Sequence, residues 1–445
     1  MARRYFGTDG IRGRVGEHPM TVDFALKLAS ATARVLAPQG GSVLIGKDTR
    51  VSGYMFESAL EAGFVAAGVN VLLMGPLPTP GIAYMTRLTK CNFGVVISAS
   101  HNPYDDNGIK FFDAEGGKLS DELEERIELE LEQPPVTRQS NSLGRAVRVD
   151  RTRVQYQQFC ASTLPEGADL SGLKIVIDCA NGAAYKVGPR VLADLGAEIV
   201  PIGCSPNGRN INDGCGSMEP GLLQLTVPGV RANVGIALDG DGDRLVMVDE
   251  LGRIVDGDQL LYIIARSRKA EGTLKGPVVG TVMSNFGLEV ALCESHIEFT
   301  RAAVGDRYVL AMLRESGGIL GGETSGHILC LDKTTTGDAL VSALQVLGEM
   351  KRTGRSLAEL AAGMNKFPQV LLNVKVAKRF DPKVVPTVQN AVRDIEKRLS
   401  GQGRVVLRAS GTEPVIRVMV EGRDEGATRA YATELADVVR AAATA

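Results

Sequence analysis

The chain has 445 residues, of which 44% are hydrophobic and 23% are charged, and its formal net charge is −2. These are ordinary values for globular proteins, and they exclude a chain that is disordered throughout. Proteins that bind nucleic acid usually carry a basic excess, so no nucleic acid partner is expected, and an anionic small molecule would have to be held by local arginines.

The cysteines and the hydropathy pattern indicate where the protein works. The 7 cysteines are dispersed and form no closely spaced pair, which is typical of reduced thiols in a cytosol. The first residues lack the apolar stretch of a signal peptide, and no apolar run reaches the ~18 residues that cross a bilayer. The sequence therefore predicts a cytoplasmic protein with no membrane partner.

Three stretches of the chain repeat one pattern, a short apolar strand followed by a helix and a second strand. The predicted elements are residues 42–46, 54–67 and 69–74 in the first stretch, 173–179, 183–195 and 197–202 in the second, and 276–283, 287–295 and 298–302 in the third. Strands without polar alternation, each coupled to a helix, indicate buried parallel βαβ units. The predicted fold class is therefore α/β.

The end of the chain has a different pattern. Its predicted strands, residues 370–376, 404–408 and 415–421, precede a helix at 425–442, which favours an α+β segment. Turn residues near 134, 252 and 367 suggest domains at 1–150, 151–253, 254–367 and 368–445. The acidic run at 121–132 is explained by a solvated helix face.

The segment 97–103 places Ser100 directly after a predicted apolar strand, with His101, Asn102 and Pro103 following it. The carboxyl end of a strand is where α/β sheets bind ligands, so Ser100 is a candidate nucleophile. A turn or helix-cap serine explains the same residues. The segment alone leaves both interpretations open.

Asp239, Asp241 and Asp243 alternate with glycines after the predicted strand 234–238. Three carboxylates this close repel one another unless a cation neutralises them, and glycine lets the backbone bend around it. A calcium EF-hand requires Gly where Arg244 stands and a helix where 245–248 reads as a strand. Magnesium is therefore the favoured cation.

Three further segments carry polar groups on turns. Arg12 lies between glycines in the segment 6–13, and a simple turn explains it equally well. The segment 321–327 joins hydroxyls, a carboxylate and an imidazole among glycines, and either a sugar site or a helix cap fits it. The segment 408–417 combines guanidinium groups, hydroxyls and Gly411, which suits a phosphate dianion better than a plain hairpin.

Taken in order, these five segments resemble the α-D-phosphohexomutase superfamily, and the likeness runs from Arg4 to Glu421. Residues 4–12 and 304–309 look like the members that act on glucosamine phosphate. Thr324 is a mild departure, since Gln or Asn is commoner there, although its side chain can still face the sugar. The resemblance implies three α/β/α domains with mostly parallel mixed sheets and a smaller C-terminal α+β domain, around a central cleft.

The resemblance also implies a role for each candidate site residue. Ser100 is the phosphoserine, and its phosphate holds one Mg²⁺ together with the three aspartates. The sugar is bound by Glu323 and Ser325, with Arg244 as a further substrate-binding residue and Arg12 offsetting phosphate charge. The non-reacting phosphate is gripped by Arg408, Ser410, Gly411, Thr412 and Arg417.

The implied enzyme is an intramolecular phosphotransferase that moves a phosphoryl group between O6 and O1 of glucosamine phosphate through a 1,6-bisphosphate. Lys110 is the first candidate for the general base, because a lysine near Mg²⁺ and Arg is expected to have a depressed pKa. His327 is the second candidate, and His101 is expected to orient the serine turn.

Several alternatives remain open at this point. A phosphomannomutase or phosphoglucomutase would use the same machinery on a hexose phosphate, and a phosphatase would result if water reached the phosphoserine. A non-catalytic phosphosugar sensor is disfavoured by the nucleophile, the aspartates and the phosphate loop together. The expected partners are a sugar phosphate and the sugar 1,6-bisphosphate as activator, and the chain is a monomer or homodimer.

Overall fold

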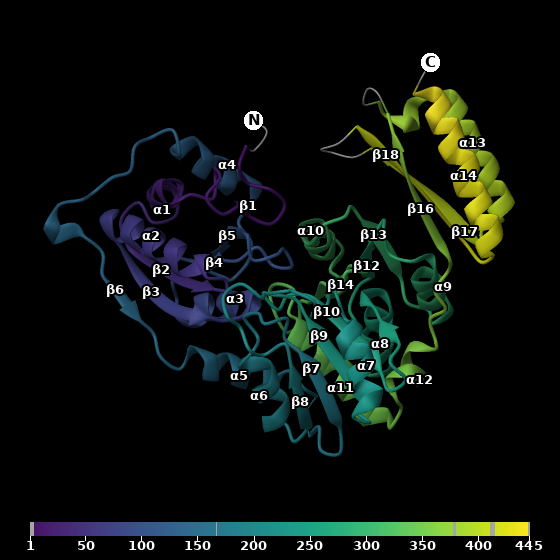
Figure 1. Cartoon of the computed structure of the whole chain (residues 1–445), viewed down its shortest axis with the longest axis horizontal. Helices are drawn as coiled ribbons and strands as arrows, with labels where there is room; N and C mark the ends of the chain where they lie inside the picture. Colours follow the sequence, from purple (N-terminus) through teal and green to yellow (C-terminus); the bar gives the residue numbers. More distant parts are fainter. Residues whose placement is uncertain (1–3, 166, 377–379, 410–413, 444–445) are drawn as a thin grey trace.

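The computed structural model describes residues 4–165, 167–376, 380–409 and 414–443. Figure 1 shows four sheets with their helices: the first three follow one another in an arc, and the fourth stands at one end of it. Within the described residues, no helix combines the length and apolar character needed to cross a membrane.

The first sheet has six strands in the order β1-β5-β4-β2-β3-β6. These are β1 (Ile11–Arg14), β2 (Gly41–Lys47), β3 (Val69–Pro76), β4 (Phe93–Ile97), β5 (Asp106–Asp113) and β6 (Ala146–Arg148). The helices of this part are α1 (Val22–Leu36), α2 (Ser52–Ala66), α3 (Thr79–Leu88), α4 (Asp121–Glu130) and the 3₁₀ turn η1 (Ser140–Ser142). β2 and β3 are parallel, so the first predicted βαβ unit is confirmed.

Burial of this sheet on both faces explains why its strands lack polar alternation. Val43 and Ile45 of β2 belong to the apolar cluster that includes α1 and α2. Leu44, between them, belongs to the cluster that includes Ile82 of α3. Successive side chains of a strand point to opposite faces, so both faces of β2 must be covered by apolar side chains.

The second sheet has the strand order β11-β10-β9-β7-β8. Its strands are β7 (Lys174–Asp178), β8 (Glu198–Ile202), β9 (Val234–Leu238), β10 (Leu245–Asp249) and β11 (Ile254–Val255), and its helices are α5 (Thr152–Ser162), α6 (Val187–Asp194) and α7 (Gly221–Gly229). β7 and β8 are parallel, as predicted, whereas β10 runs antiparallel to β9. β11 pairs with β10 although it follows the predicted boundary at 253; the domain boundaries stay predictions.

The third sheet has the strand order β13-β12-β14-β15. Its strands are β12 (Val278–Thr281), β13 (Phe299–Ala302), β14 (Leu320–Gly322) and β15 (Ile328–Cys330). Its helices are α8 (Gly257–Ala270), α9 (Phe286–Glu294), α10 (Asp306–Ser316), α11 (Ala339–Thr353) and α12 (Leu357–Ala361). The predicted parallel pairing of the third βαβ unit is confirmed for β12 and β13.

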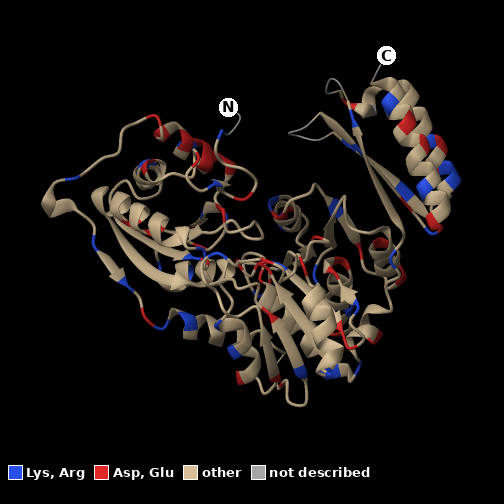
Figure 2. Cartoon of the chain, in the orientation of Figure 1, with Lys and Arg blue, Asp and Glu red and all other residues tan. Residues whose placement is uncertain are grey.

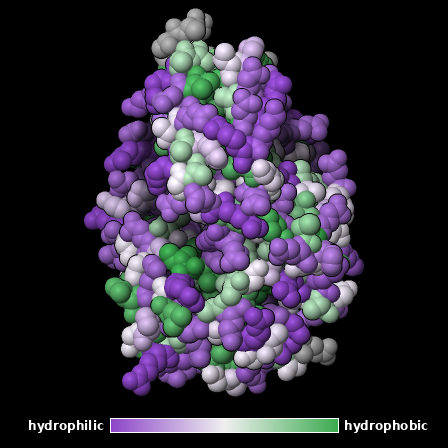
Figure 3. Space-filling model, turned by 90° about the vertical axis from the view of Figure 1, so that its right-hand side faces the viewer, coloured by the Kyte–Doolittle hydropathy of each residue, from purple (hydrophilic) through white to green (hydrophobic). Residues whose placement is uncertain are grey.

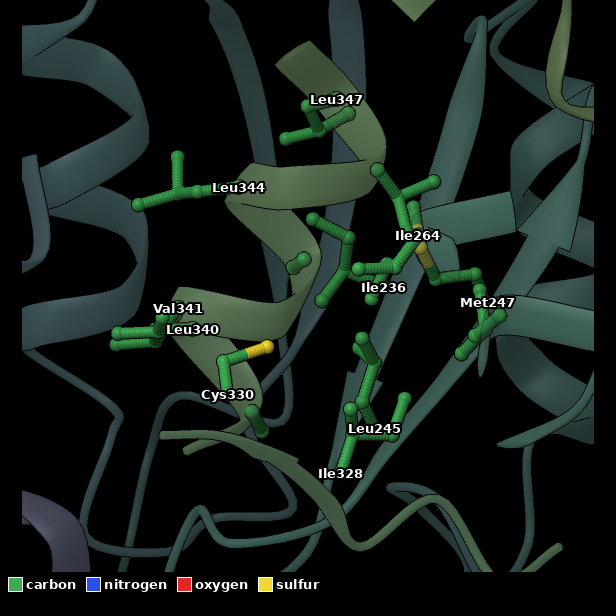
Figure 4. Packing of buried hydrophobic residues seen from close by; sticks show 14 of the residues in the cluster. Ile236, Leu245, Met247, Ile264, Ile328, Cys330, Leu340, Val341, Leu344 and Leu347 are labelled. Atoms are coloured by element: carbon green, nitrogen blue, oxygen red, sulfur yellow. The ribbon is translucent and has the colours of Figure 1, made fainter. Parts of the chain in front are cut away.

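A single apolar core joins the second and third sheets. Figure 4 shows Leu340, Leu344 and Leu347 of α11 beside Ile236 of β9 and Ile328 of β15. All of these side chains are fully or almost fully buried. Because the two sheets share this core, the loops at their strand ends are held in a fixed relation to each other.

The C-terminal part is an antiparallel sheet with the order β16-β18-β17, covered by two helices. Its elements are β16 (Gln369–Lys375), η2 (Pro382–Val384), α13 (Pro386–Leu399), β17 (Gly403–Ala409), β18 (Val415–Gly422) and α14 (Glu425–Ala442). Its own core confirms the predicted α+β segment. Figure 3, which looks at this end of the molecule, shows mostly hydrophilic side chains on the surface.

Asp338 caps α11 and provides a test of the buried core. Its carboxylate is buried and accepts hydrogen bonds from the N–H of Val341 at 3.0 Å and the hydroxyl of Tyr156 at 2.8 Å. Burial raises the pKa of Asp338 to about 6. The folded state therefore binds the carboxyl proton of Asp338 more tightly than the unfolded chain does, because the pKa of Asp in the unfolded chain is about 3.9. Asp338 therefore stabilises the fold fully at pH values below its pKa in the unfolded chain. This stabilisation is lost as the pH rises through the pKa of Asp338 in the folded state.

We expect Asp338→Asn, which keeps an acceptor for Val341, to remove this pH dependence. Between about pH 4.5 and about pH 7.5, the wild type should lose about 2 kcal/mol more free energy of unfolding than the variant. Urea unfolding of both proteins at the two pH values measures the difference, with the exposed Asp213→Asn as control. An equal loss in wild type and Asp338→Asn would contradict the prediction.

Candidate active site

Ser100 lies in the turn after β4, as predicted. Its side chain is 1% exposed, and its backbone is in the left-handed region, with φ of 53°. Its hydroxyl donates a hydrogen bond to Asp239 Oδ2 at 2.6 Å. The left-handed region is unfavourable for a residue with a side chain, so the surrounding structure must hold this turn.

Two successive buried hydrogen bonds support the backbone N–H of Ser100. Ser98 Oγ accepts from the N–H of Ser100 at 2.9 Å and donates to Asp48 Oδ2 at 2.6 Å. Asp48 also pairs with Arg50 at 2.8 Å, and both side chains are fully buried. The pair follows β2, so the neighbouring strand fixes the backbone around Ser100.

The carbonyl side of the turn is held by two donors from different parts of the chain. Arg50 donates to the carbonyl oxygens of Ser100 at 2.9 Å and Asn102 at 2.8 Å, and also to that of Pro103. Asn212, from the second part, donates to the carbonyls of Ser100 and Asn102 at 2.9 and 3.0 Å. A hydrogen bond from a charged group is stronger than one between neutral groups, so Arg50 contributes more than Asn212 to holding the turn.

The three predicted aspartates lie together in the turn between β9 and β10. One carboxylate oxygen from each of Asp239, Asp241 and Asp243 lies within 4.8 Å of the others, and all three side chains are buried. Gly240 permits close approach of this turn to the serine turn, because a Cβ there would lie 2.6 Å from the carbonyl oxygen of Ser100. β10 follows the aspartate turn as a strand, as predicted, whereas an EF-hand requires a helix at this place.

The triad has the properties of a site for a hard cation. Burial, followed by the charges of Asp243 and Asp241, raises the pKa of Asp239 well above its usual value. Asp241 Oδ1 and Asp243 Oδ1 are buried and have no hydrogen-bond partner among the described residues. Oxygen donors in this crowded, desolvated arrangement fit a divalent cation such as Mg²⁺.

The predicted pKa of Lys110 is wrong. Lys110 Nζ pairs with Asp241 Oδ2 and with Asp9 Oδ2, each at 2.8 Å. Burial alone would lower its pKa, but the two carboxylates raise it above the usual value. Lys110 therefore carries a proton at neutral pH and is a charge partner of Asp241, not a ready proton acceptor.

Two arginines and His101 surround the cleft side of Ser100. Arg12 pairs with Asp9 and donates to the carbonyl of Ala99 at 3.3 Å. The N–H of Arg244 donates to Asp239 Oδ1 at 3.1 Å, and its guanidinium lines the cleft. Burial and then the charges of Arg244 and Arg12 lower the pKa of His101 to about 4, so this imidazole is neutral. Its Nδ1 lies 3.4 Å from the Oγ of Ser100.

His327 joins the aspartate turn to α10. Its Nδ1 lies 3.7 Å from Asp243 Oδ1, and its Nε2 lies 3.3 Å from Asp306 Oδ2. Burial alone would lower the pKa of His327, but these carboxylates raise it to about 9. At neutral pH it carries a proton, which suits charge stabilisation or proton donation better than the predicted role of general base.

The residues predicted to bind the sugar divide between the cleft and the surface. Glu323 lines the cleft, and its Oε1 accepts from the N–H of Gly305 at 2.9 Å. Ser325 is exposed and is not among the described residues that line the cleft. The hydroxyl of Thr324 donates to the buried Asp258 at 2.8 Å, so this group already has a partner within the protein.

Of the predicted phosphate loop, only the flanking strands can be placed. Arg408 and Arg417 are exposed partners across β17 and β18, and Arg408 lines the cleft. Ser410, Gly411 and Thr412 lie outside the described residues. Arg404 of β17 donates to the carbonyls of Val282 at 2.9 Å and Ser284 at 2.6 Å, which attaches this sheet to the third part of the chain.

These groups meet at one cleft of about 520 Å³. Its described lining combines the residues Tyr5, Gly7, Thr8, Asp9, Gly10, Arg12, Ser100, His101, Asp243, Arg244, Val304, Gly305, Asp306, Glu323, His327 and Arg408. All four parts of the chain contribute. Figure 2, in which acidic residues are red, shows several of them gathered along the ribbon where the first three sheets meet. A buried serine hydroxyl, clustered carboxylates and several cationic side chains in one cleft suit phosphoryl transfer.

Comparisons with known proteins agree with this geometry. Residues 3–135, 156–252 and 256–367 match the α/β/α domains I, II and III described as phosphoglucomutase/phosphomannomutase, and 371–438 match the C-terminal domain of that description. The phosphoglucosamine mutase of Thiobacillus denitrificans is 56% identical over 453 residues, which cover 100% of this chain and 99% of that protein. The chain belongs to the phosphoglucosamine mutase family.

Solved structures of more distant phosphohexomutases share the fold. A phosphoglucomutase/phosphomannomutase family protein from Burkholderia thailandensis is 24% identical with a TM-score of 0.82, covering 98% of this chain and 97% of that one. The Aspergillus fumigatus N-acetylphosphoglucosamine mutase, solved with GlcNAc-6P and magnesium, is 19% identical with a TM-score of 0.71, covering 99% and 96%. The predicted fold of three α/β/α domains and a smaller C-terminal domain is confirmed for this member of the phosphoglucosamine mutase family.

Several residues of the site were not among the predicted ones. Asp9 is close to Arg12 in sequence and lines the cleft, and Asp306, which also lines it, lies in the segment 304–309 that carries part of the family resemblance. Asp48 and Arg50 follow β2 at the same sheet edge as the serine turn, which was an available signal. Lys118, which pairs with Asp9 and Asp306, has no sequence pattern that distinguishes it from a surface lysine.

Proposed function

We propose that this chain interconverts glucosamine 6-phosphate and glucosamine 1-phosphate through a phosphoserine at Ser100 and a glucosamine 1,6-bisphosphate. The observation that carries the proposal is the Ser100 hydroxyl at 2.6 Å from the aspartate triad, at the floor of a cleft in a member of the phosphoglucosamine mutase family. The product would supply amino-sugar nucleotides for cell-wall polymer. The dispersed free cysteines favour the cytoplasm as its compartment.

Mg²⁺ is the cation that we propose for the triad. Asp239, Asp241 and Asp243 would hold it, and when bound it would neutralise charge on the transferring phosphoryl group. Around this site, Arg12, Arg244 and protonated His327 place positive charge along the cleft. Such fixed charges stabilise a phosphoryl transition state without reorganisation.

Two transfers on the same serine complete the reaction. In the first, the bond between phosphorus and Ser100 Oγ breaks as phosphorus bonds O1 of the sugar, and the proton of that sugar hydroxyl ends on Ser100 Oγ. The bisphosphate then turns around, Oγ takes the phosphoryl group from O6, and the hydroxyl proton of Ser100 ends on O6. The hydrogen bond to Asp239 directs the hydroxyl hydrogen of Ser100 toward a carboxylate, so Oγ can present a lone pair to the phosphorus. Arg408, which lines the cleft, would hold whichever phosphate does not react.

The test is a comparison of glucosamine, glucose and mannose 6-phosphates with Mg²⁺ and a trace of sugar 1,6-bisphosphate. We expect kcat/KM for glucosamine 6-phosphate to exceed that for the other two sugars by at least about tenfold, since one well-placed polar contact is worth about that much. A higher kcat/KM for a hexose phosphate would replace the proposed substrate. Net release of inorganic phosphate at the rate of turnover would indicate a phosphatase instead.

A further inference from the structure

The acidic residues of α4 form a contact surface, and the predicted solvated face is wrong for part of this helix. Figure 2 shows much of the α4 ribbon in the colour of acidic residues, near the N-terminus. Asp121, Glu124 and Glu128 are spaced three and four residues apart, so they share one face of the helix. Glu128 accepts from the backbone N–H groups of residues 4–6 at 2.7 to 2.8 Å, and Glu124 is buried.

Glu124 is buried because it binds Arg307, which comes from the third part of the chain. Arg307 donates through both terminal nitrogens, NH2 to Glu124 Oε1 at 2.6 Å and NH1 to Glu124 Oε2 at 3.1 Å. NH1 also contacts Asp121. The side chains of Glu124 and Arg307 are 5% and 15% exposed. A two-pronged, desolvated contact of this kind fixes direction as well as distance.

The backbone around Arg307 connects this contact to the cleft. The N–H of Arg307 donates to Asp306 Oδ1 at 2.8 Å, and Asp306 lines the cleft. Asp306 Oδ2 also pairs with Lys118 Nζ at 2.5 Å. The N–H of Gly305, one residue before Asp306, donates to Glu323 Oε1 at 2.9 Å. Arg307 is therefore connected to two carboxylates that line the cleft, those of Asp306 and Glu323, through the backbone of residues 305–307.

We propose that Arg307, held by Glu124 and Asp121 of α4, is a positioning residue that sets the affinity of the cleft for its sugar phosphate. The contact anchors residues 304–306 against the first part of the chain, and these residues place Asp306 and Glu323 at the cleft. The inference rests on the proposed function only for the identity of the sugar. It assigns to α4 a role in substrate binding although none of its residues touches the cleft.

The test is steady-state kinetics of wild type, Arg307→Met, Arg307→Lys, Glu124→Gln and the double variant Arg307→Met/Glu124→Gln with glucosamine 6-phosphate. We expect Arg307→Met to raise KM by about tenfold while kcat stays within about threefold, because binding contacts are lost and the transferring groups are not. Arg307→Lys should recover part of the loss. The double variant should be no worse than Arg307→Met, since both changes remove one interaction.

The matched control is Glu122→Gln, on the exposed face of the same helix, which should leave KM unchanged. A merely structural role would lower the active fraction, and hence the apparent kcat, without moving KM. An unchanged KM in Arg307→Met, or additive effects in the double variant, would overturn the inference. If Arg307→Met does not fold, the nearly isosteric Glu124→Gln decides by the same criterion. If the wild type prefers a hexose phosphate, the proposed substrate is replaced and the same variants are compared on that sugar.

Discussion

Ser100→Ala is expected to lose turnover of glucosamine 6-phosphate by a factor on the order of 10⁴ or more, while its thermal unfolding changes little. The variant removes only the Oγ atom, and the turn keeps its supports, because Ser98, Arg50 and Asn212 all bind the backbone of the turn. Thr79 also donates its hydroxyl to the triad, to Asp241 at 2.7 Å, but among the described residues that line the cleft only Ser100 makes such a contact. The chemistry therefore depends on this one oxygen.

The measurement pairs kinetics with mass spectrometry of the purified proteins. After incubation with sugar 1,6-bisphosphate, the wild type should gain one phosphate on the peptide containing Ser100, and Ser100→Ala should gain none. Ser140→Ala, an exposed serine in η1, is the control and should behave as the wild type. Turnover by Ser100→Ala at the wild-type rate would show that the phosphoserine mechanism is wrong.

Strand ends explain why much of the fold and part of the site can be predicted from the sequence. Parallel strands place their carboxyl ends at one edge of a sheet, so residues that directly follow apolar strands are candidates for a common site. Ser100 follows β4 and Asp239 follows β9, and their side chains are in contact. The apolar, unalternating strands likewise predicted the parallel pairs, because burial on both faces leaves no polar position.

Electrostatics at the site could not be predicted in the same way. The expected low pKa of Lys110 followed from cations nearby, but Asp9 and Asp241 are the closer charges, and their positions depend on the packing of separate parts of the chain. Thr324 is similar, because its hydroxyl turns to Asp258, a residue far away in sequence. A charge count by segment does not give distances, and the sign of a pKa shift depends on distances.

Support residues were missed for a different reason. Arg50 and Glu124 look like ordinary charged residues in the sequence, and such residues are usually solvated. Arg50 is fully buried because backbone carbonyls and Asp48 satisfy its guanidinium, and Glu124 is buried because Arg307 reaches it from another part of the chain. Their roles follow from which surfaces meet, and hydrophobic periodicity carries no information about that.

Asp239→Asn is expected to change activity and stability in opposite directions. Asp239 is the carboxylate that contacts Ser100, and burial together with Asp243 and Asp241 raises its pKa well above the usual value. Because the folded state resists its negative charge, this group costs stability at neutral pH, and the cost is relieved by a cation or by loss of the charge. The asparagine keeps the shape and removes the charge, so the metal-free variant should melt on the order of 2–4 °C higher than the metal-free wild type.

The same variant should lose activity by a factor on the order of 10³, because it weakens the cation site and the acceptor for Ser100 together. Thermal melts in a chelator and in Mg²⁺ give the measurement: the wild type should be stabilised by Mg²⁺, and the variant much less. Asp213→Asn, an exposed aspartate from the same part of the chain, is the control. A variant that keeps the full Mg²⁺-dependent shift would show that Asp239 is not a ligand. A variant that is less stable than the wild type in the chelator would show that the charge of Asp239 does not destabilise the fold. A higher melting temperature without metal and a smaller shift with Mg²⁺ occur together only if Asp239 binds the cation and its charge destabilises the metal-free fold.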